Sequence, residues 1–304
     1  MTGGASVDVL IVSYNTRDLL RSCLRSALDE LGAVTGTEIR ISVLDNASTD
    51  GSADMVAAEF PEVRLIRETA NLGFGAANNR LAATSSAPHV LLMNPDTIVT
   101  EDLVTPLLAV LESDRSIAVV GPRLVYPDGE PQRSSELFPT LAFEFAREIH
   151  ATKLEPLLRP VFDAGGVLRR HRREDLIDDR TEHDAEFLWA TCWLLRRDEH
   201  LQGIFDERFP VYDEDLDLCR RLRAQGRRVV YVPGVELVHL GGRSSTPDRK
   251  RRLMVRGRTR YFAYHDGVAV KVLYRGMAEG VRLVKRGFAL ARSGWRRSTS
   301  RGVA

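Results

Sequence analysis

Four acidic side chains lie close together in the sequence: Asp213, Glu214, Asp215 and Asp217. Like charges held this close raise the pKa of at least one carboxyl group, and a carboxylate with a raised pKa is suited to take a proton from a substrate as a general base. One or two of these acids would also stabilise the start of a helix through its dipole, and this alternative stays open for part of the cluster.

Polar residues also follow three apolar runs, at 7–14, 38–45 and 89–93, whose composition predicts strands. They are Ser13, Tyr14 and Asn15 after the first run, Asp45 and Asn46 after the second, and Asn94, Pro95 and Asp96 after the third. In an open parallel sheet, ligands bind at such strand ends. Asp96 suits a hard cation, and Asp45 suits a nucleobase or ribose. A turn or capping role is the alternative for both.

The sequence contains no glycine-rich phosphate loop: G-x-G-x-x-G does not follow the first strand, and G-x-x-x-x-G-K-[ST] is absent. A bound anion would therefore need a metal ion, which points back to the carboxylates. His239 follows an apolar run and precedes two glycines. From the residues alone, a structural role for this histidine is more common than a ligand role, and both stay open.

Strand patterns at 7–14, 38–45, 63–68, 89–93 and 117–126 alternate with helical patterns. This alternation predicts an α/β fold, with a mostly parallel central sheet and helices on both faces. Residues 130–185 lose the rhythm and predict a loop with one or two helices, whereas 215–225 predict a helix and 228–240 predict two short strands. From 247 onward the pattern is helical and basic.

The composition is that of a folded globular chain: 304 residues, 43% hydrophobic and 28% charged, with a net charge of +1. It excludes a disordered or fibrous protein. Three scattered cysteines exclude a disulfide framework, and none has an evident activating partner. No apolar run approaches the roughly 18 to 20 residues of a membrane span, and the first residues do not resemble a signal peptide. We expect a cytoplasmic protein.

The charge is unevenly distributed along the chain. Residues 243–304 carry 17 basic and 3 acidic residues, whereas 1–242 carry 26 basic and 39 acidic ones. The basic segment suits the surface of an anionic membrane. A helical hairpin packed on the acidic body, or a homodimer contact, is an equal alternative. Nucleic acid is not expected, since no recognition motif accompanies the charge.

Together these segments resemble the inverting family 2 glycosyltransferases with a GT-A fold, particularly the bacterial rhamnosyltransferase-like branch. The matching stretches are VSYNT (12–16), VLDNASTDGS (43–52), NLGFGAANNR (71–80), LLMNPDTIV (91–99), GPRLVYPDG (121–129), IFDERFPVYDEDLDLCRRLRAQG (204–226) and VELVHLGGRSS (235–245). They cover roughly residues 7–265 in the family's order. The chain departs from the family at Ala190-Thr191 and Gly203-Ile204, on the expected acceptor side, which leaves the acceptor open.

The resemblance implies a role for each motif residue. Ser13, Tyr14 and Asn15 would line the nucleotide pocket, and Asp45 would recognise the base of the nucleotide. Asn71 and Gly73 would help close the donor site. Asn94 and Asp96 stand at the family's D-x-D motif, and Asp215 would be the catalytic base. His239 would join Asp96 in holding Mg2+ or Mn2+. The implied division is a GT-A domain at 1–246, with a nucleotide-sugar half at about 1–126 and an acceptor half at about 127–246, and a basic helical extension at 247–304.

The implied activity is a metal-dependent, inverting transfer of rhamnose or a similar sugar from a nucleoside-diphosphate donor, dTDP-rhamnose or a UDP-sugar. The acceptor would be a saccharide, a lipid-linked sugar or a small molecule, in cell-wall, polysaccharide or glycoconjugate synthesis, with the enzyme in the cytoplasm or at the inner face of the membrane. A natural-product glycosyltransferase and a non-catalytic nucleotide-sugar-binding homologue are the alternatives. A nucleotidyltransferase is disfavoured because 13–20 is not glycine-rich.

Overall fold

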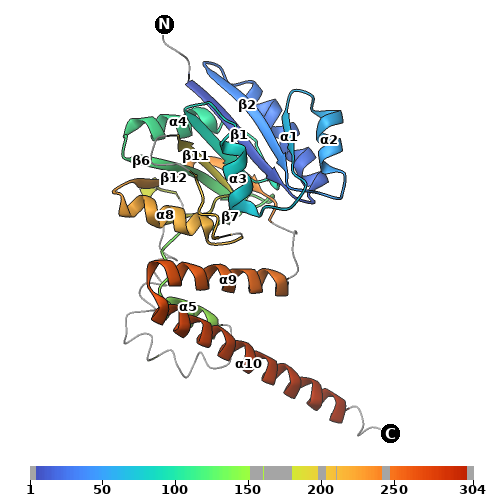
Figure 1. Ribbon diagram of the computed structural model, residues 1–304, viewed down its shortest axis with the longest axis vertical. Coiled ribbons are helices and arrows are strands. Elements are labelled where there is room, and N and C mark those ends of the chain that lie inside the picture. The colour runs from blue at the N-terminus through green and yellow to red at the C-terminus, as the bar shows by residue number, and fades with distance from the viewer. Residues whose placement is uncertain are drawn as a thin grey trace. The chain divides into compact units, whose positions relative to one another are not determined.

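The computed structural model describes residues 5–150, 160, 180–197, 203–209, 211–241 and 247–299 (Figure 1). The chain divides into two compact units. The first comprises Met1–Phe138 and Ile177–Gly257, and the second comprises Pro139–Leu176 and Arg258–Ala304. This division differs from the one expected from the sequence, because it cuts within a helix at residue 257 and adds part of the middle segment to the second unit.

The first half of the sheet consists of parallel strands. They are β1 (Ala5–Ser13), β2 (Thr37–Asp45), β3 (Arg64–Arg67) and β4 (His89–Met93), in the order β3-β2-β1-β4. In the register of β1 with β2, Ser13 lies opposite Asp45, so both strands end at the same edge of the sheet. All five residues of β4 are buried, as expected for a parallel strand covered on both faces.

The second half of the sheet is mixed. β11 (Cys192–Arg196) runs antiparallel between β4 and β6 (Ile117–Val125), and β12 (Arg228–His239) runs parallel to β6. β5 (Thr97–Ile98) is antiparallel to β12. Two further short strands belong to this sheet: β7 (Pro131–Gln132) pairs with β6, and β9 (His183–Asp184) pairs with β12. β8 (Ser135–Glu136) and β10 (Phe187–Leu188) form a separate two-stranded sheet.

The sequence predicted two short strands where the structure has the single strand β12. Its pairing with β6 shifts register between Val232 and Glu236. Pro233 and Gly234 lie in that interval. Proline offers no N–H to a ladder, so the strand bulges there and resumes pairing afterwards.

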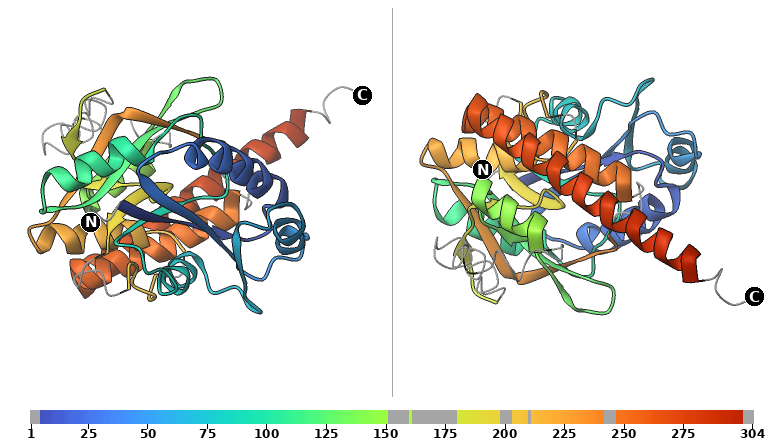
Figure 2. Two further views of the ribbon diagram at one scale, coloured as in Figure 1. Left: turned by 90° about the horizontal axis from the view of Figure 1, so that it is seen from above. Right: turned by 90° about the horizontal axis from the view of Figure 1, so that it is seen from below.

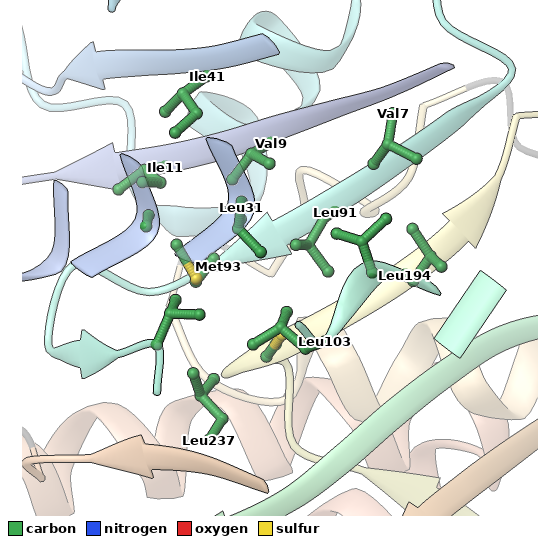
Figure 3. Close-up of a cluster of buried hydrophobic side chains, with 14 of the residues drawn as sticks. Val7, Val9, Ile11, Leu31, Ile41, Leu91, Met93, Leu103, Leu194 and Leu237 are labelled. Atoms are coloured by element: carbon green, nitrogen blue, oxygen red, sulfur yellow. The ribbon is translucent and has the colours of Figure 1, made fainter. Parts of the chain in front are cut away.

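Helices cover both faces of the sheet (Figure 2). They are α1 (Arg17–Gly32), α2 (Ser52–Glu59), α3 (Phe74–Ala82), α4 (Val104–Ser113) and α8 (Glu214–Ala224). α1, α2 and α4 contribute side chains to one large apolar core together with Val9, Ile11 and Leu91 (Figure 3), and α3 lies on the opposite face. On α1, Leu20, Leu24 and Leu31 are among the residues that face this core at helical spacing.

The second unit is helical. It contains α5 (Leu141–His150), the end of α9 (Pro247–His265) and α10 (Val268–Thr299). The rings of Phe262 and Tyr274 lie 5.1 Å apart, and the buried Glu144 forms ion pairs with Arg147 and Arg258. Within the part of the chain that the structure describes, no helix is both long and apolar enough to cross a bilayer.

Candidate active site

The loop after β1 is tied to the loop after β2. Ser13 is fully buried, with its Oγ 2.8 Å from Oγ1 of Thr16. Asn15 adopts a left-handed conformation (φ 53°), its backbone N–H donates to Oγ of Ser48 at 2.9 Å, and its Oδ1 accepts from the backbone N–H of Thr49 at 2.8 Å. The polar residues predicted at these two strand ends are therefore brought together, while the neighbouring Tyr14 is exposed.

Asp45, at the end of β2, is buried, and only one of its two carboxylate oxygens accepts a hydrogen bond from the described residues. Its Oδ2 accepts from the backbone N–H of Ser48 at 3.0 Å. Its Oδ1 is buried and has no hydrogen-bond partner among the described residues. A buried polar atom without a partner typically costs about 1–3 kcal/mol, more when it is charged. This oxygen is thus available to accept a hydrogen bond from a ligand.

Asn46 fixes the loop that precedes α3. Its Nδ2 donates to the carbonyl of Gly73 at 3.2 Å and to Oδ1 of Asn71 at 3.3 Å, and its Oδ1 accepts from the backbone N–H of Leu72 at 2.8 Å. Gly73 has a φ of 86°, which favours glycine. Apart from its position next to Asp45, nothing in the sequence indicated this role for Asn46.

Asp96 and His239 meet although they lie far apart in the sequence. The pairing of β5 with β12 sets His239 opposite Thr97, and the backbone N–H of Leu240 donates to the carbonyl of Asp96 at 2.9 Å. Nε2 of His239 lies 3.3 Å from Oδ2 of Asp96. The predicted pair is therefore assembled by the sheet itself.

Gln132, which the sequence analysis missed, orients this histidine. Its Oε1 lies 2.8 Å from Nδ1 of His239, and its Nε2 donates to the carbonyl of the same residue at 2.6 Å. Because an amide oxygen only accepts, Nδ1 carries a proton. Nε2, the other ring nitrogen, faces the Asp96 carboxylate, and a nitrogen and an oxygen placed in this way could both bind a cation. The described residues contain no cluster of three acidic, histidine or cysteine ligands, so any cation here would need ligands from the substrate or water.

Asp215 lies in the first turn of α8. Tyr212 and Asp213, just before the helix, both have left-handed backbones, with φ of 66° and 67°. Oδ1 of Asp215 accepts from the backbone N–H of Leu216 at 2.9 Å, and Oδ2 accepts from the backbone N–H of Ala190 at 3.3 Å. Burial, followed by the charge of Asp213, raises the pKa of Asp215 to about 7. A carboxyl group in this range is suited to general-base work.

The other acids of the cluster have different surroundings. Asp217 is fully buried and paired with Arg221 at 2.7 Å, which indicates a structural role. Asp213 lies just before the helix, at its N-cap position, with a left-handed backbone. Glu214 is buried, its Oε2 has no partner among the described residues, and burial raises its pKa well above the usual range. Glu214 is therefore a second titratable group that the sequence did not single out.

The turn between β10 and β11 joins the two predicted centres. Ala190 donates to Asp215, and the carbonyl of the next residue, Thr191, accepts from the backbone N–H of Asn94 at 2.9 Å. Trp189 donates through its indole N–H to Oε1 of Glu136 at 3.3 Å. Ala190 and Thr191, one of the two places where the sequence departs from the family pattern that it resembles, thus contact both Asp215 and Asn94.

Covalent catalysis by a cysteine does not fit the described structure. Cys23, Cys192 and Cys219 are all buried. Burial raises the pKa of Cys23 to about 12 and that of the other two further still. Thiols in this state are poor nucleophiles.

One cavity among the described residues lies away from these strand ends. It measures about 400 Å³ and is lined by residues that include Asp8, Arg40 and Ser42. Asp8 and Arg40 lie in the amino-terminal halves of β1 and β2, whereas Asp45 lies at the carboxyl end of β2, so this cavity is not the predicted ligand site.

The profile of a known family, described as Glycosyl transferase family 2, matches residues 8–201. The chain belongs to glycosyl transferase family 2. It is 30% identical over 270 residues to the N-acetylglucosaminyl-diphospho-decaprenol L-rhamnosyltransferase of Mycobacterium tuberculosis, covering 85% of this chain and 83% of that protein. The resemblance inferred from the motifs and the assignment as a transferase enzyme are thereby confirmed.

Solved glycosyltransferase structures share the fold. One is a mannosyltransferase from Pyrobaculum calidifontis in complex with GDP-Man and Mn2+, with a TM-score of 0.56 and 17% identity, covering 98% of this chain and 81% of that one. Another is GalNAc-T7 with UDP, GalNAc and Mn2+, with a TM-score of 0.57 and 13% identity, covering 80% and 45%. The predicted GT-A fold is confirmed, although the antiparallel β11 was not foreseen.

Proposed function

We propose that this family 2 glycosyltransferase transfers rhamnose or a similar sugar, with inversion, from a nucleoside-diphosphate donor to a hydroxyl group of a lipid-linked saccharide. The proposal rests on one observation: a single turn connects Asp215 to the segment that contains Asp96. Residues 190 and 191 link Asp215, a carboxyl group with a raised pKa, to Asn94, two residues before the Asp96–His239 pair.

Asp215 would act as the general base. The acceptor hydroxyl gives its proton to Asp215 as its oxygen bonds to the anomeric carbon, while the bond from that carbon to the diphosphate breaks and its electron pair leaves with the diphosphate. One displacement inverts the anomeric configuration and needs no protein nucleophile. The proton transfer is the step for which a carboxyl pKa of about 7 is suited.

Asp96 and His239 would hold Mg2+ or Mn2+ against the donor diphosphate, with Gln132 orienting the histidine. When bound, such an ion neutralises the charge that develops on the departing diphosphate. A carboxylate oxygen and an imidazole nitrogen are suitable ligands for Mn2+, and two solved relatives by fold contain that ion.

The donor would be bound at the carboxyl ends of β1 and β2. The unpartnered Oδ1 of Asp45 is suited to accept a hydrogen bond from a nucleobase N–H or a ribose hydroxyl. Ser13, Tyr14 and Asn15 would line the pocket, and Asn71 and Gly73 would close it. A dTDP- or UDP-sugar fits this assignment because both bases carry a ring N–H.

The acceptor class is proposed from the Mycobacterium tuberculosis relative, whose name gives an N-acetylglucosaminyl-diphospho-decaprenol acceptor. Such an acceptor is anchored in a membrane, so the enzyme would act at the inner face of the cell membrane, in cell-wall or polysaccharide synthesis.

A panel of donors and acceptors tests this function. The purified chain is incubated with dTDP-rhamnose or UDP-sugars and either a polyprenyl-diphosphate saccharide or a soluble aromatic aglycone, and release of nucleoside diphosphate is measured. We expect release that depends on the lipid-linked saccharide, with an inverted anomeric carbon in the product. Transfer only to the aglycone would overturn the acceptor class, and donor binding without transfer to any acceptor would indicate a non-catalytic homologue.

A further inference from the structure

The helix α10 of the second unit exposes apolar side chains along one face. Four of them are largely exposed: Val268 (69%), Val272 (61%), Leu273 (60%) and Leu283 (62%). Ala269, Gly276 and Gly280 are exposed as well. At about 100° per residue, all seven fall within an arc of about 140°. Glu279 also falls within this arc, near the edge of the face, where it pairs with Arg282 at 2.9 Å. An exposed face with several large apolar side chains marks an interaction surface more often than chance.

This face is not the one by which α10 packs within its unit. The buried residues of α10 are Tyr274, Ala278 and Val281, which lie on the opposite side of the helix from the exposed apolar arc. Tyr274 contacts the ring of Phe262 on α9, and α10 lies beside α5 (Figures 1 and 2). The apolar arc therefore faces away from the packed side of the helix.

Basic side chains border the apolar arc. Lys271, Arg275 and Arg282 lie along one edge, and Arg282 pairs with Glu279 at 2.9 Å. Lys271 and Arg275 have no acidic partner among the residues that the structure describes. Over its full length α10 carries eight basic residues and one acidic residue.

This charge selects among the possible partners of the apolar face. A second copy of α10 laid against the first would bring two strongly basic helices together, and like charges would oppose the contact. An anionic lipid surface offers both the apolar layer for the arc and the negative charge for its border. We propose that α10 binds the surface of an anionic membrane, with Val272, Leu273 and Leu283 entering the boundary between headgroups and acyl chains.

The proposal concerns the second unit alone and does not rest on the identity of the sugar or of the base. Its test is accordingly a binding measurement on the full chain, with transfer to a soluble acceptor analogue as a separate check that the catalytic unit is folded. A failure of membrane binding would leave transfer unaffected, and a failure of transfer would leave binding unaffected.

The experiment is co-flotation with vesicles of pure phosphatidylcholine or of phosphatidylcholine with about one third phosphatidylglycerol. We expect binding to the anionic vesicles that falls steeply as salt is raised, because screening shortens the reach of surface charge. Leu273→Glu should weaken binding at least about tenfold, because it puts a charge into the apolar face. Lys271→Glu with Arg275→Glu should weaken binding to anionic vesicles in the same direction.

Ala57→Glu is the matched control, since it adds the same charge to an exposed position of α2 in the first unit. It should bind vesicles as the unchanged chain does. Equal binding by Leu273→Glu and Ala57→Glu, or binding that ignores anionic lipid and salt, would overturn the proposal. So would a dimer in sedimentation that Leu273→Glu dissociates in the absence of any vesicle binding, because the face would then belong to a second copy.

Discussion

Two neighbouring acids, Glu214 and Asp215, compete for the role of base, and their hydrogen bonds separate them. Asp215 accepts two backbone N–H groups, which favour its charged form, so its pKa stays near 7 despite burial. Burial raises the pKa of Glu214 well above its usual range, and its Oε2 has no partner among the described residues. At neutral pH we therefore expect Asp215 to be partly ionised, whereas burial disfavours the charged form of Glu214.

The pH dependence of transfer follows from this difference. A base must be deprotonated, so kcat/KM should fall as the pH drops below about 7. Asp213→Asn should shift this fall to lower pH, because the charge of Asp213 contributes to the raised pKa of Asp215, while burial remains. Glu214→Gln should leave the fall where it is. Rate profiles between pH 5 and 9 measure both, and loss of the fall in Glu214→Gln would instead identify Glu214 as the base.

Asp215 has a matching effect on stability. Its pKa is higher in the folded state than the ordinary 3.8, so the folded state holds an extra proton between about pH 4 and 7. The free energy of unfolding should therefore decrease as the pH rises through this window. Chemical denaturation at several pH values checks the sign, and Asp215→Asn should remove this contribution.

Asp96 and His239, the proposed metal ligands, give a further prediction at this scale. Chelation with EDTA should abolish transfer, and Mg2+ or Mn2+ should restore it. His239→Ala should raise the metal concentration needed for half-maximal activity, and Gln132→Ala should raise it by about 10–100-fold, the usual effect of losing a partner that orients a ligand. Full transfer in the presence of the chelator would contradict the assignment of Asp96 and His239.

At the scale of elements, α9 packs against the turn that immediately precedes Asp215. A Cβ atom added at Gly257 would lie 2.6 Å from the carbonyl oxygen of Tyr212 and 3.4 Å from Oδ2 of Asp213. The helix and the left-handed turn can approach this closely only because residue 257 has no side chain. The basic extension expected from the sequence to begin at 247 therefore starts with a segment that supports the catalytic unit.

Gly257→Ala should consequently displace the turn at Tyr212 and Asp213. We expect kcat to fall by about tenfold or more, since small misplacements of catalytic groups are costly, with a shifted pH profile as Asp213 moves relative to Asp215. Gly276→Ala is the control, because nothing lies within 4 Å of its Cβ position. That change should leave kcat unaltered and stabilise α10 by about 0.5–1 kcal/mol. Equal kinetics for the two variants would contradict the claim that α9 supports the turn at Tyr212 and Asp213.

The elements that the sequence predicted correctly are those with a clear local pattern. The buried run at 89–93 became β4, and the acidic start at 214 became α8. A local sequence pattern does not show which distant segment an element pairs with. The insertion of β11 between β4 and β6 and the contact of Gln132 with His239 were therefore not foreseen. Glu214 was missed as a separate candidate because its burial is set by the fold.

At the scale of the whole molecule, the family and the fold were accessible from the ordered set of motifs. Several of them span the end of a strand: 12–16 the end of β1, 43–52 the end of β2 and 91–99 the end of β4. The division into two units was not accessible in this way. Its boundary falls within the continuous helix α9, at Gly257, and a single glycine inside a basic helical pattern does not by itself indicate a change of unit.

The central claim is that Asp215 removes the proton of the acceptor hydroxyl, and turnover measured beside donor affinity in Asp215→Asn tests it most directly. The amide keeps the shape of the side chain and loses the proton acceptor. The account predicts a fall in turnover of about 10²–10⁴-fold, with donor affinity within about threefold of the unchanged chain. Asp217→Asn, which weakens the buried pair with Arg221, should lower thermal stability more than turnover. Near-normal turnover in Asp215→Asn, or loss of donor binding together with turnover, would contradict the account.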